Sequence, residues 1–577
     1  MNYIIKFFKF IIKEIFSFFI KLFLLFGLII VCITIFLNKT EDKMILRDSY
    51  LVIDCSQPFS EQSYKTLLGG NSISFFDLLT VIDYVKTDRN ILGVVLDLNN
   101  VTLSTTQINE LGEKLKELKD YNKHTFSFMD NANNKNLLLS SYTDQTFMPE
   151  SKATQVNISP YFSEEYYPKA LMDKIGISFN VINIGDYKSY GQNLVSENMS
   201  PENREFATRI NDKIYENFIE EISKNKNLNK STISQKIENG DFIYSNSNNL
   251  FDNQLISGYG NIASFHKENE KSNINFINLD EYTKHINLNF AQDNIVVLVL
   301  EGNIYDEQPP QGFVYESYII ADEVISALDR MQEDDSVRGV VLRIDSPGGS
   351  AYTADIISKR VKEFSKTKPI YVSMGSVAAS GGYYIAANAN KIFANNNTIT
   401  GSIGVVSILP NYSKLINNAG INVETIKKGK YSDIYSLSLP FTEEKYNKIR
   451  ESNLEVYDEF LDVVSIGRHI QKEKVHDIAQ GKIWTGSEGK EIGLVDEIGG
   501  LDDTIKALAE DLKLDRYASL QYSYDRDMKS AYKKYFNFFN FIKTKKSFLK
   551  FAQDTLFMDE TLLNKPITYT EEYINRR

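Results

Sequence analysis

The chain has 577 residues, which is too long for a single hydrophobic core, so a division into about two to four domains is expected. Its 42% hydrophobic and 24% charged residues are typical of a globular protein. The net charge of −12 argues against a nucleic-acid-binding protein, because such a protein would present a basic face.

The N-terminus has the pattern of a single membrane-spanning helix. Residues 15–37 contain one charged side chain, Lys21, and they exceed the roughly 20 residues needed to cross a bilayer. Lysines at positions 6, 9 and 13 precede this stretch, so the positive-inside rule places residues 1–14 in the cytoplasm and the rest of the chain outside. A cleaved signal peptide is the alternative, but it would have a shorter apolar core and a cleavage site of small residues.

The region after this anchor is an internal duplication. The tetrapeptide Gly-Val-Val-Leu occurs at 93–96 and again 246 positions later, at 339–342. Each copy opens with a strand-like run, a helical pattern of apolar residues and a second strand-like run. These segments are 50–54, 76–86 and 91–98 in the first copy, and 295–300, 321–331 and 337–344 in the second. Strands that alternate with helices predict an α/β fold of two tandem repeats with mostly parallel strands.

The end of the chain departs from the repeats. It combines an aromatic run at 535–542 with flanking lysines. This composition fits an amphipathic helix on a membrane surface or a helix packed on a neighbouring subunit. The predicted parts of the whole chain are a cytoplasmic basic segment (1–14), a transmembrane signal anchor (15–37), a linker (38–48), an N-terminal repeat (49–288), a C-terminal repeat (289–515) and the aromatic and basic tail (516–577).

A serine in the second repeat stands among small residues. Ser380 follows a predicted strand at 371–374 and a predicted turn at 376–379, and a helix is expected to begin near it. The first repeat has Asn134 at the corresponding position. A serine in this place is commonly the N-cap of the helix. The small neighbours also leave room for an acyl group, as a serine nucleophile requires.

The lysine that would complete a hydrolytic dyad belongs to the first repeat. Lys188 ends a Gly-Asp-Tyr-Lys run, and Ser432 stands at the corresponding position of the second repeat. A single lysine is normally a solvated surface charge. As a general base it must be neutral near pH 7, which requires a pKa lowered by about three units at a cost of about 4 kcal/mol. A pocket shared by the two repeats would supply that burial and would bring Lys188 to Ser380.

A glycine-rich turn, Asp-Ser-Pro-Gly-Gly-Ser at 345–350, follows a strand of the second repeat. The backbone N–H groups of Gly348 and Gly349, together with that of Gly381, are candidate donors to an oxyanion. The first repeat has Asn-Asn-Val-Thr at 99–102, with neither proline nor glycine. A tight turn without a catalytic role is the alternative.

As a set, these motifs resemble the signal peptide peptidase A family in its long, duplicated form. The resemblance spans roughly residues 45–515 and includes further motifs in both repeats. These are Asn-Met-Ser-Pro at 198–201, Thr-Gly-Ser-Ile-Gly at 400–404, Trp-Thr-Gly at 484–486 and Gly-Leu-Val-Asp at 493–496. The resemblance implies a crotonase and Clp-protease type of fold and a serine endopeptidase that degrades signal-peptide remnants or other membrane-associated peptides. It also implies a homotetramer in the bacterial inner membrane, with its catalytic part on the periplasmic side.

The resemblance further implies the role of each residue. Ser380 would be the nucleophile, Lys188 the general base, and Ser402 would orient the lysine amine. Such a dyad requires no metal and no cofactor. A Ser-His-Asp triad is a weaker candidate, because none of the five histidines lies in a motif-bearing segment.

Two other functions are compatible with a duplicated fold of this kind. A catalytically inactive membrane scaffold that binds peptides or envelope proteins would keep the glycines but would not need Ser380 and Lys188 together. An enzyme of the crotonase type that acts on an acyl thioester would need an adenine-nucleotide pocket, for which the sequence shows no feature.

Overall fold

The computed structural model describes residues 46–64, 72–286, 291–309, 317–524 and 567–569, and the single positions 17, 21, 25 and 27. Most of the predicted anchor and the aromatic run of the tail therefore lie outside the described residues. Within the described part, no helix is both long enough and apolar enough to cross a membrane. The anchor at 15–37 stays a prediction.

The N-terminal repeat forms a six-stranded sheet in the order β8-β5-β3-β2-β1-β9, with parallel pairing throughout. Helices α2 (Phe75–Thr87) and α3 (Thr105–Glu117) begin at Ser74 and Ser104, whose side chains accept the N–H three residues on. The predicted strand–helix–strand order of this repeat is confirmed. The strands are β1 (Ser49–Asp54), β2 (Ile91–Asp97), β3 (His124–Phe128), β5 (Gln145–Met148), β8 (Gly258–Tyr259) and β9 (Asn275–Asn278).

The C-terminal repeat forms an eight-stranded sheet in which β10, β13 and β15 pair in parallel at the centre. Its helices α12 (Ala321–Glu333) and α13 (Ala351–Phe364) follow β10 and β13, as predicted. Continuous apolar runs in these strands suit a parallel sheet that is covered on both faces. The strands are β10 (Asn294–Glu301), β13 (Val337–Ser346), β15 (Ile370–Ala379), β16 (Lys391–Ala394), β17 (Ile399–Gly401), β19 (Ile483–Thr485), β20 (Glu497–Ile498) and β21 (Ala518–Gln521).

The prediction of a short strand and a separate turn before Ser380 was wrong. β15 continues to Ala379, so the supposed turn at 376–379 belongs to the strand. Its pairing with β13 is regular up to Met374 and resumes at Ala378. Small residues suggested a turn, but here they accommodate a bulged strand.

A third sheet joins the two repeats, in the order β12-β11-β14-β22-β18-β7. Its strand β7 precedes Lys188 in the first repeat and pairs along its whole length with β18 of the second repeat. The lysine-bearing segment is therefore built into the structure of the other repeat. The strands are β7 (Ser178–Ile184), β11 (Asn303–Ile304), β12 (Tyr318–Ile319), β14 (Gly348–Ser350), β18 (Val405–Asn411) and β22 (Ile567–Tyr569).

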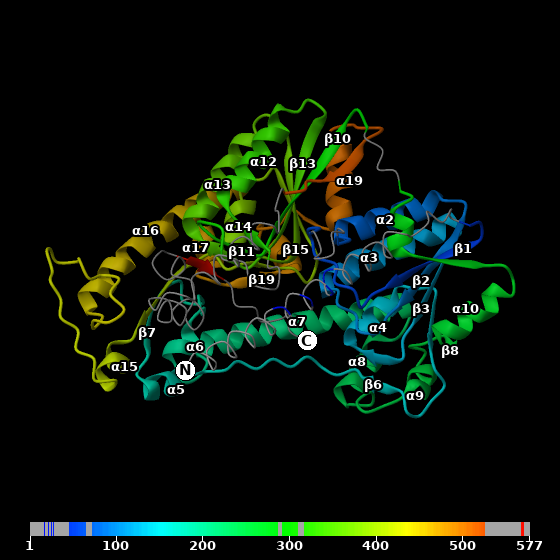
Figure 1. Cartoon of the computed structure of the whole chain (residues 1–577), viewed down its shortest axis with the longest axis horizontal. Helices are drawn as coiled ribbons and strands as arrows, with labels where there is room; N and C mark the ends of the chain where they lie inside the picture. Colours follow the sequence, from blue (N-terminus) through cyan, green and yellow to red (C-terminus); the bar gives the residue numbers. More distant parts are fainter. Residues whose placement is uncertain are drawn as a thin grey trace, which may run out of the picture.

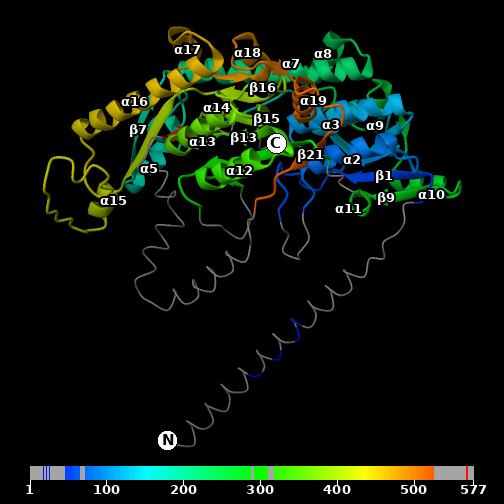
Figure 2. The ribbon, with the colours of Figure 1, turned by 90° about the horizontal axis from the view of Figure 1, so that it is seen from above.

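The two repeats also share packing. Helix α7 (Pro201–Lys226) runs along one side of the molecule beneath both repeats (Figure 1), and its Phe206 and Ile210 pack with Ile399 and Ile483. The largest core cluster combines first-repeat side chains with one face of β10 and with helix α19 (Leu501–Asp511). Viewed from above, the first repeat and the second lie side by side (Figure 2). Burial across this junction makes the relative position of the repeats part of the fold.

The remaining described elements surround these sheets. The short β4 (Asn131–Asn133) and β6 (Gln155–Asn157) pair with each other in the first repeat. The helices are η1 (Leu118–Tyr121), α4 (Asn134–Ser141), α5 (Lys169–Ile175), α6 (Gln192–Val195), α8 (Lys230–Glu238), α9 (Ser247–Asp252), α10 (Ile262–Glu270), α11 (Leu279–Thr283), α14 (Gly381–Ala386), α15 (Ser413–Asn418), α16 (Glu443–Arg468), α17 (Lys472–Ile478) and α18 (Gly486–Glu491).

Candidate active site

The structure brings Lys188 of the first repeat and Ser380 of the second repeat together within one chain. Lys188 Nζ lies 2.8 Å from Ser380 Oγ, although 192 positions separate the two residues. Both side chains are buried, Lys188 to 3% exposure and Ser380 to 0%. A hydroxyl and an amine are thus in direct hydrogen-bond contact in a water-excluded place.

Ser380 occupies an unusual backbone conformation between β15 and α14. Its φ is 54° and its ψ is −117°, outside the regions that residues other than glycine ordinarily adopt. Its N–H donates to the carbonyl of Gly401 at 2.8 Å, and its side chain makes no capping hydrogen bond to α14. The interpretation of Ser380 as an ordinary N-cap is therefore wrong. Strain of this kind is concentrated at functional sites.

Lys188 reaches Ser380 because the segment after β7 packs closely on the backbone of Gln480 and Gly481 in the second repeat. The N–H of Tyr187 donates to the carbonyl of Gln480 at 2.9 Å. Gly481 lies against Lys188 so closely that a Cβ there would come within 2.4 Å of the lysine backbone N. Because Gly481 has no Cβ, the backbone of Lys188 can approach it closely, and the lysine side chain can enter the second repeat.

Burial lowers the pKa of the Lys188 ammonium well below its ordinary value. None of the ion pairs among the described residues includes Lys188, so no carboxylate there restores its charge. The interpretation of Lys188 as a solvated surface charge is wrong. A neutral amine carries two N–H groups and one lone pair, and the lone pair can accept a proton.

Ser402 supplies the other two contacts of the amine. Lys188 Nζ donates to the Ser402 carbonyl at 2.9 Å and lies 2.9 Å from Ser402 Oγ. Because a carbonyl oxygen only accepts, one N–H of the amine is directed to it, and the second N–H can be directed to the hydroxyl. The lone pair of a neutral amine then points to Ser380. Ser402 itself has a φ of 52°, and its N–H donates to the carbonyl of Lys482 at 2.7 Å.

The three glycines proposed as oxyanion donors are near one another but differ in what they do. Gly348 has a φ of 111°, and its N–H donates to Ser346 Oγ at 3.2 Å. Gly349 has a φ of 149° and lies so close to Ile304 that a Cβ would be 2.2 Å from its carbonyl oxygen. Gly381 is the first residue of α14, where N–H groups have no acceptor within the helix.

A segment from the far end of the chain lies beside these glycines. In β22, Tyr569, Thr568 and Ile567 pair antiparallel with 348–350 of β14, and Ile567 also pairs with Val406 of β18. An extended chain can therefore lie between β14 and β18. No sequence signal pointed to this strand, because the helix expected in the tail concerned only the aromatic run at 535–542 and its flanking lysines.

Comparison with known proteins links both repeats to one protein family. The family model Peptidase family S49 matches residues 117–271 and 362–515. "Protease 4" of Haemophilus influenzae is 28% identical over 486 residues, which are 79% of this chain and 77% of that protein. The "Putative signal peptide peptidase SppA" of Enterococcus faecium is 38% identical over 236 residues, 41% of this chain and 68% of that protein.

A plant relative and a solved structure are also similar. The "Serine protease SPPA, chloroplastic" of Arabidopsis thaliana is 28% identical over 434 residues, 73% of this chain and 64% of that protein. The solved structure of a ClpP1 mutant from Listeria monocytogenes has a TM-score of 0.24 and 15% identity, and it covers 36% of this chain and 94% of its own. With so low a score, the Clp-protease type of fold stays an expectation, whereas the α/β class with two repeats is confirmed.

Proposed function

Because the chain belongs to Peptidase family S49 and is a serine peptidase, we propose that it cleaves peptides with a Ser/Lys dyad of Ser380 and Lys188. The observation that carries this proposal is the 2.8 Å contact between Lys188 Nζ and Ser380 Oγ in a buried site. The lowered pKa of Lys188 supports the same assignment, since a neutral amine can act as a general base.

The reaction follows from this arrangement. Neutral Lys188 takes the proton of the Ser380 hydroxyl as Oγ attacks the peptide carbonyl carbon, and a tetrahedral oxyanion forms. Lysine, now an ammonium oriented by Ser402, returns the proton to the departing amine as the C–N bond breaks. Water then attacks the acyl-enzyme, again with Lys188 as base, and hydrolysis restores Ser380. Backbone N–H groups of Gly348, Gly349 and Gly381 are the candidate donors to the oxyanion.

For Gly348, this role requires a change of partner, because its N–H donates to Ser346 Oγ in the described state. For Gly381, the position at the head of α14, directly after Ser380, supports the assignment. A donor adjacent to the nucleophile moves with it, so the attacking oxygen and the oxyanion donor keep a fixed relation.

The proposed substrate is an extended peptide that adds as a strand between β14 and β18. The pairing of β22 with both strands supports this mode, because peptide backbones that add to strand edges obtain main-chain hydrogen bonds irrespective of sequence. Signal-peptide remnants and other membrane-associated peptides, with small or aliphatic side chains, fit this mode. We further propose a homotetramer that is anchored in the bacterial inner membrane by residues 15–37, with the repeats on the periplasmic side.

Labelling with a serine-reactive fluorophosphonate tests the proposal. The full chain should be labelled at Ser380 and should hydrolyse an extended fluorogenic peptide, whereas Ser380→Ala and Lys188→Met should do neither. Lys226→Met is the matched control, since burial also lowers the pKa of Lys226, to about 8, but its Nζ contacts Thr146. Labelling that persists in Ser380→Ala would reject the assignment and point to another nucleophile, whereas a parent chain that is not labelled would favour an inactive scaffold.

A further inference from the structure

The strand that leads to Ser380 contains a bulge. Between the paired positions Met374 and Ala378, three residues of β15 stand opposite a single residue of β13, Asp345. A bulge bends its strand and changes the direction of the side chains that follow. The conformation of these three residues therefore determines where Ser380 presents its hydroxyl.

Asp345 holds the bulge from the neighbouring strand. Its Oδ1 accepts the N–H of Val377 at 2.9 Å. Its side chain also fills the space beside Gly375, where an added Cβ would be 2.9 Å from Asp345 Cβ. Because Asp345 stands one residue before the end of β13, and Pro347 then leads into the glycines of β14, one residue is joined to both the glycine segment and the strand that ends at the nucleophile.

The first repeat contacts the same bulge. Ser376, its middle residue, has its Oγ 2.7 Å from Thr106 Oγ1 and donates to Ser104 Oγ at 2.8 Å. Both partners lie at the start of α3. The repeat that supplies the lysine thus also supports the strand that presents the serine.

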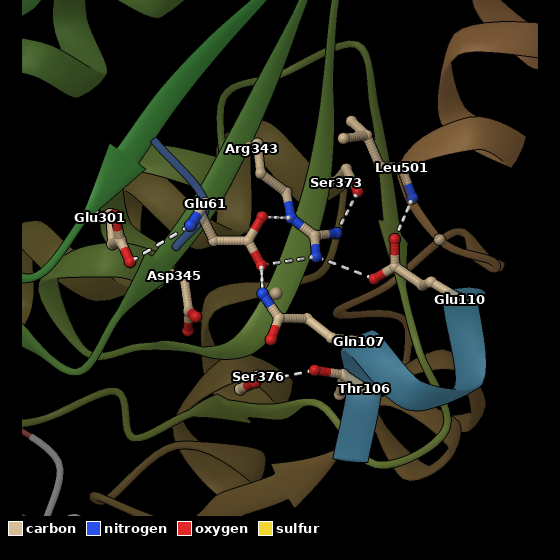
Figure 3. A network of polar contacts seen from close by, with 12 residues as sticks. Glu61, Thr106, Gln107, Glu110, Glu301, Arg343, Asp345, Ser373, Ser376 and Leu501 are labelled. Carbon is tan, nitrogen blue, oxygen red and sulfur yellow. Dashed lines mark hydrogen bonds and ion pairs between the residues drawn. The ribbon is translucent and has the colours of Figure 1, made fainter. Parts of the chain in front are cut away.

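Arg343 fixes β13 to the first repeat just before Asp345. Its guanidinium, which is completely buried, binds Glu61 at 3.0 and 3.1 Å and Glu110 at 2.8 Å. The guanidinium also donates to Ser373 Oγ of β15 at 2.9 Å, so the two first-repeat carboxylates and this serine surround it (Figure 3). Buried ionic contacts of this kind resist displacement, because breaking one leaves an uncompensated charge.

The surroundings of the Asp345 carboxyl favour its uncharged form. Burial raises its pKa to about 8, and the charges of Glu61 and Glu301 add to this effect, while Arg343 opposes it. These are the charged groups that bear on it from the loop after β1, from the end of β10 and from β13 itself. In either protonation state, a carboxyl oxygen of Asp345 accepts the Val377 N–H.

The first repeat makes a similar contact with an amide, although its donor, Asp130, corresponds to Ser376 rather than to Val377 at the 246-residue spacing. Asn99 stands 246 positions before Asp345, and its Oδ1 accepts the N–H of Asp130 at 3.0 Å. An asparagine oxygen is thus able to hold this part of the fold. The charge of a carboxylate is not required for the contact.

We infer that Asp345 is a positioning residue whose side-chain oxygen fixes the bulge of β15 and so sets the contact between Ser380 Oγ and Lys188 Nζ. This inference rests on the proposed dyad. The Ser104 and Thr106 hydroxyls hold the same bulge relative to the first repeat, which carries the lysine, and the Arg343 contact to Ser373 holds the strand just before it.

Three variants of the full chain test the inference. Asp345→Ala removes the acceptor, and Asp345→Asn keeps an oxygen acceptor without a titratable group. Asn390→Ala is the matched control, because Asn390 Oδ1 accepts the N–H of Ile370 at 2.9 Å at the opposite end of β15. For each variant, the rate of fluorophosphonate labelling at Ser380 and the kcat and KM for a fluorogenic peptide are measured, with folding checked by thermal unfolding.

We expect Asp345→Ala to lower kcat and the labelling rate about 100-fold with little change in KM, as a displacement of reacting atoms by about 1 Å does. Asp345→Asn should stay close to the parent in both rates. Asn390→Ala should lose stability but keep the parent kcat. A role in stability alone would not produce this separation between kcat and KM, nor the rescue by asparagine.

Several outcomes would overturn the inference. Parent-like rates in Asp345→Ala would do so, as would an Asp345→Asn variant as slow as Asp345→Ala, since the carboxyl would then act through its charge. If Asp345→Ala does not fold, Thr106→Val is measured instead, because it removes a hydroxyl that contacts Ser376 of the bulge. This variant should lower kcat without changing KM. An unchanged kcat would count against the inference. A parent chain that is not labelled at Ser380 would instead refute the proposed dyad.

Discussion

The two repeats place a helix at the same point of the fold, but one helix is capped and the other is not. In the first repeat, α4 begins after Asn133, which has a φ of −128° and accepts the N–H of Asn136 in a capping box. In the second repeat, α14 begins after Ser380, which has a φ of 54° and makes no capping bond. The first arrangement satisfies the helix end, whereas the second leaves a strained residue whose hydroxyl contacts Lys188.

This difference shows that the two repeats contribute different parts of the site. The first repeat has ordinary local structure at this point and contributes its lysine through β7, which pairs with the other repeat. In the second repeat, the Ser380 hydroxyl does not cap its helix and instead contacts Lys188. Neither repeat holds both Lys188 and Ser380, so the contact between them depends on the interface.

The largest expected effect concerns the proposed dyad, whose two side chains meet only at the junction of the repeats. Ser380→Ala and Lys188→Arg should each lower kcat on the order of 10⁴- to 10⁶-fold, as loss of a nucleophile or its base does in other serine peptidases. Arginine fails as a base because its guanidinium keeps its proton. Steady-state hydrolysis of a fluorogenic peptide measures this effect. Activity near the parent level in Lys188→Arg would place the base elsewhere.

A second prediction concerns the stability cost of the buried lysine. Its folded pKa lies below its unfolded value, so the folded state binds fewer protons and the free energy of unfolding rises with pH up to about 10.5. Lys188→Met removes this dependence. We expect the variant to be more stable than the parent, by an amount that grows as the pH falls from about 10, at up to about 1.4 kcal/mol per pH unit.

Denaturant titrations at several pH values measure this difference. Lys226→Met is again the control, and its advantage should stop growing near pH 8, where the folded Lys226 takes up its proton. A difference between Lys188→Met and the parent that does not vary with pH would mean that the buried amine is charged.

A third prediction concerns β22, the strand that lies between β14 and β18. Ending the chain after Tyr524 removes β22 and frees both strands for a substrate peptide. We expect kcat/KM to rise severalfold, because the peptide no longer competes with a tethered strand. A chain that retains the tail but carries Thr568→Pro, which removes one strand N–H, should show a smaller rise in the same assay. An unchanged kcat/KM in both would show that β22 does not compete with substrate.

The smallest effect separates the two helix starts. Asn133→Ala should lower the free energy of unfolding by about 1 kcal/mol through loss of the cap, with kcat unchanged. Ser380→Ala removes no capping bond but takes the hydroxyl partner from the buried Lys188 amine, so any loss of stability should disappear in a Lys188→Met background, although activity is lost. Chemical denaturation of both variants tests this contrast. A loss of about 1 kcal/mol that persists in the Lys188→Met background would mean that Ser380 also caps its helix.

Much of this architecture could be predicted from local sequence. The repeated strand–helix–strand order follows from apolar periodicity, and the structure confirms it in both repeats. The duplication also pointed to Ser380 and Lys188, since each lacks its counterpart in the other repeat. The sequence-based prediction failed at the bulge of β15, where small residues suggested a turn, and it did not include β22, because only the aromatic run at 535–542 carried an expectation in the tail.

The sequence by itself determined the strand–helix–strand elements of both repeats, the duplication and the two chemically significant side chains. These features follow from the periodicity and spacing of residues that are near one another in the chain. Only the tertiary structure decided that β7 crosses to the other repeat, that Lys188 is buried against Ser380, and that Asp345 holds the strand between them. Those features depend on contacts between residues far apart in the chain. Burial and hydrogen bonding across the junction of the repeats determine these features, and a local sequence pattern predicts neither the burial nor the hydrogen bonds.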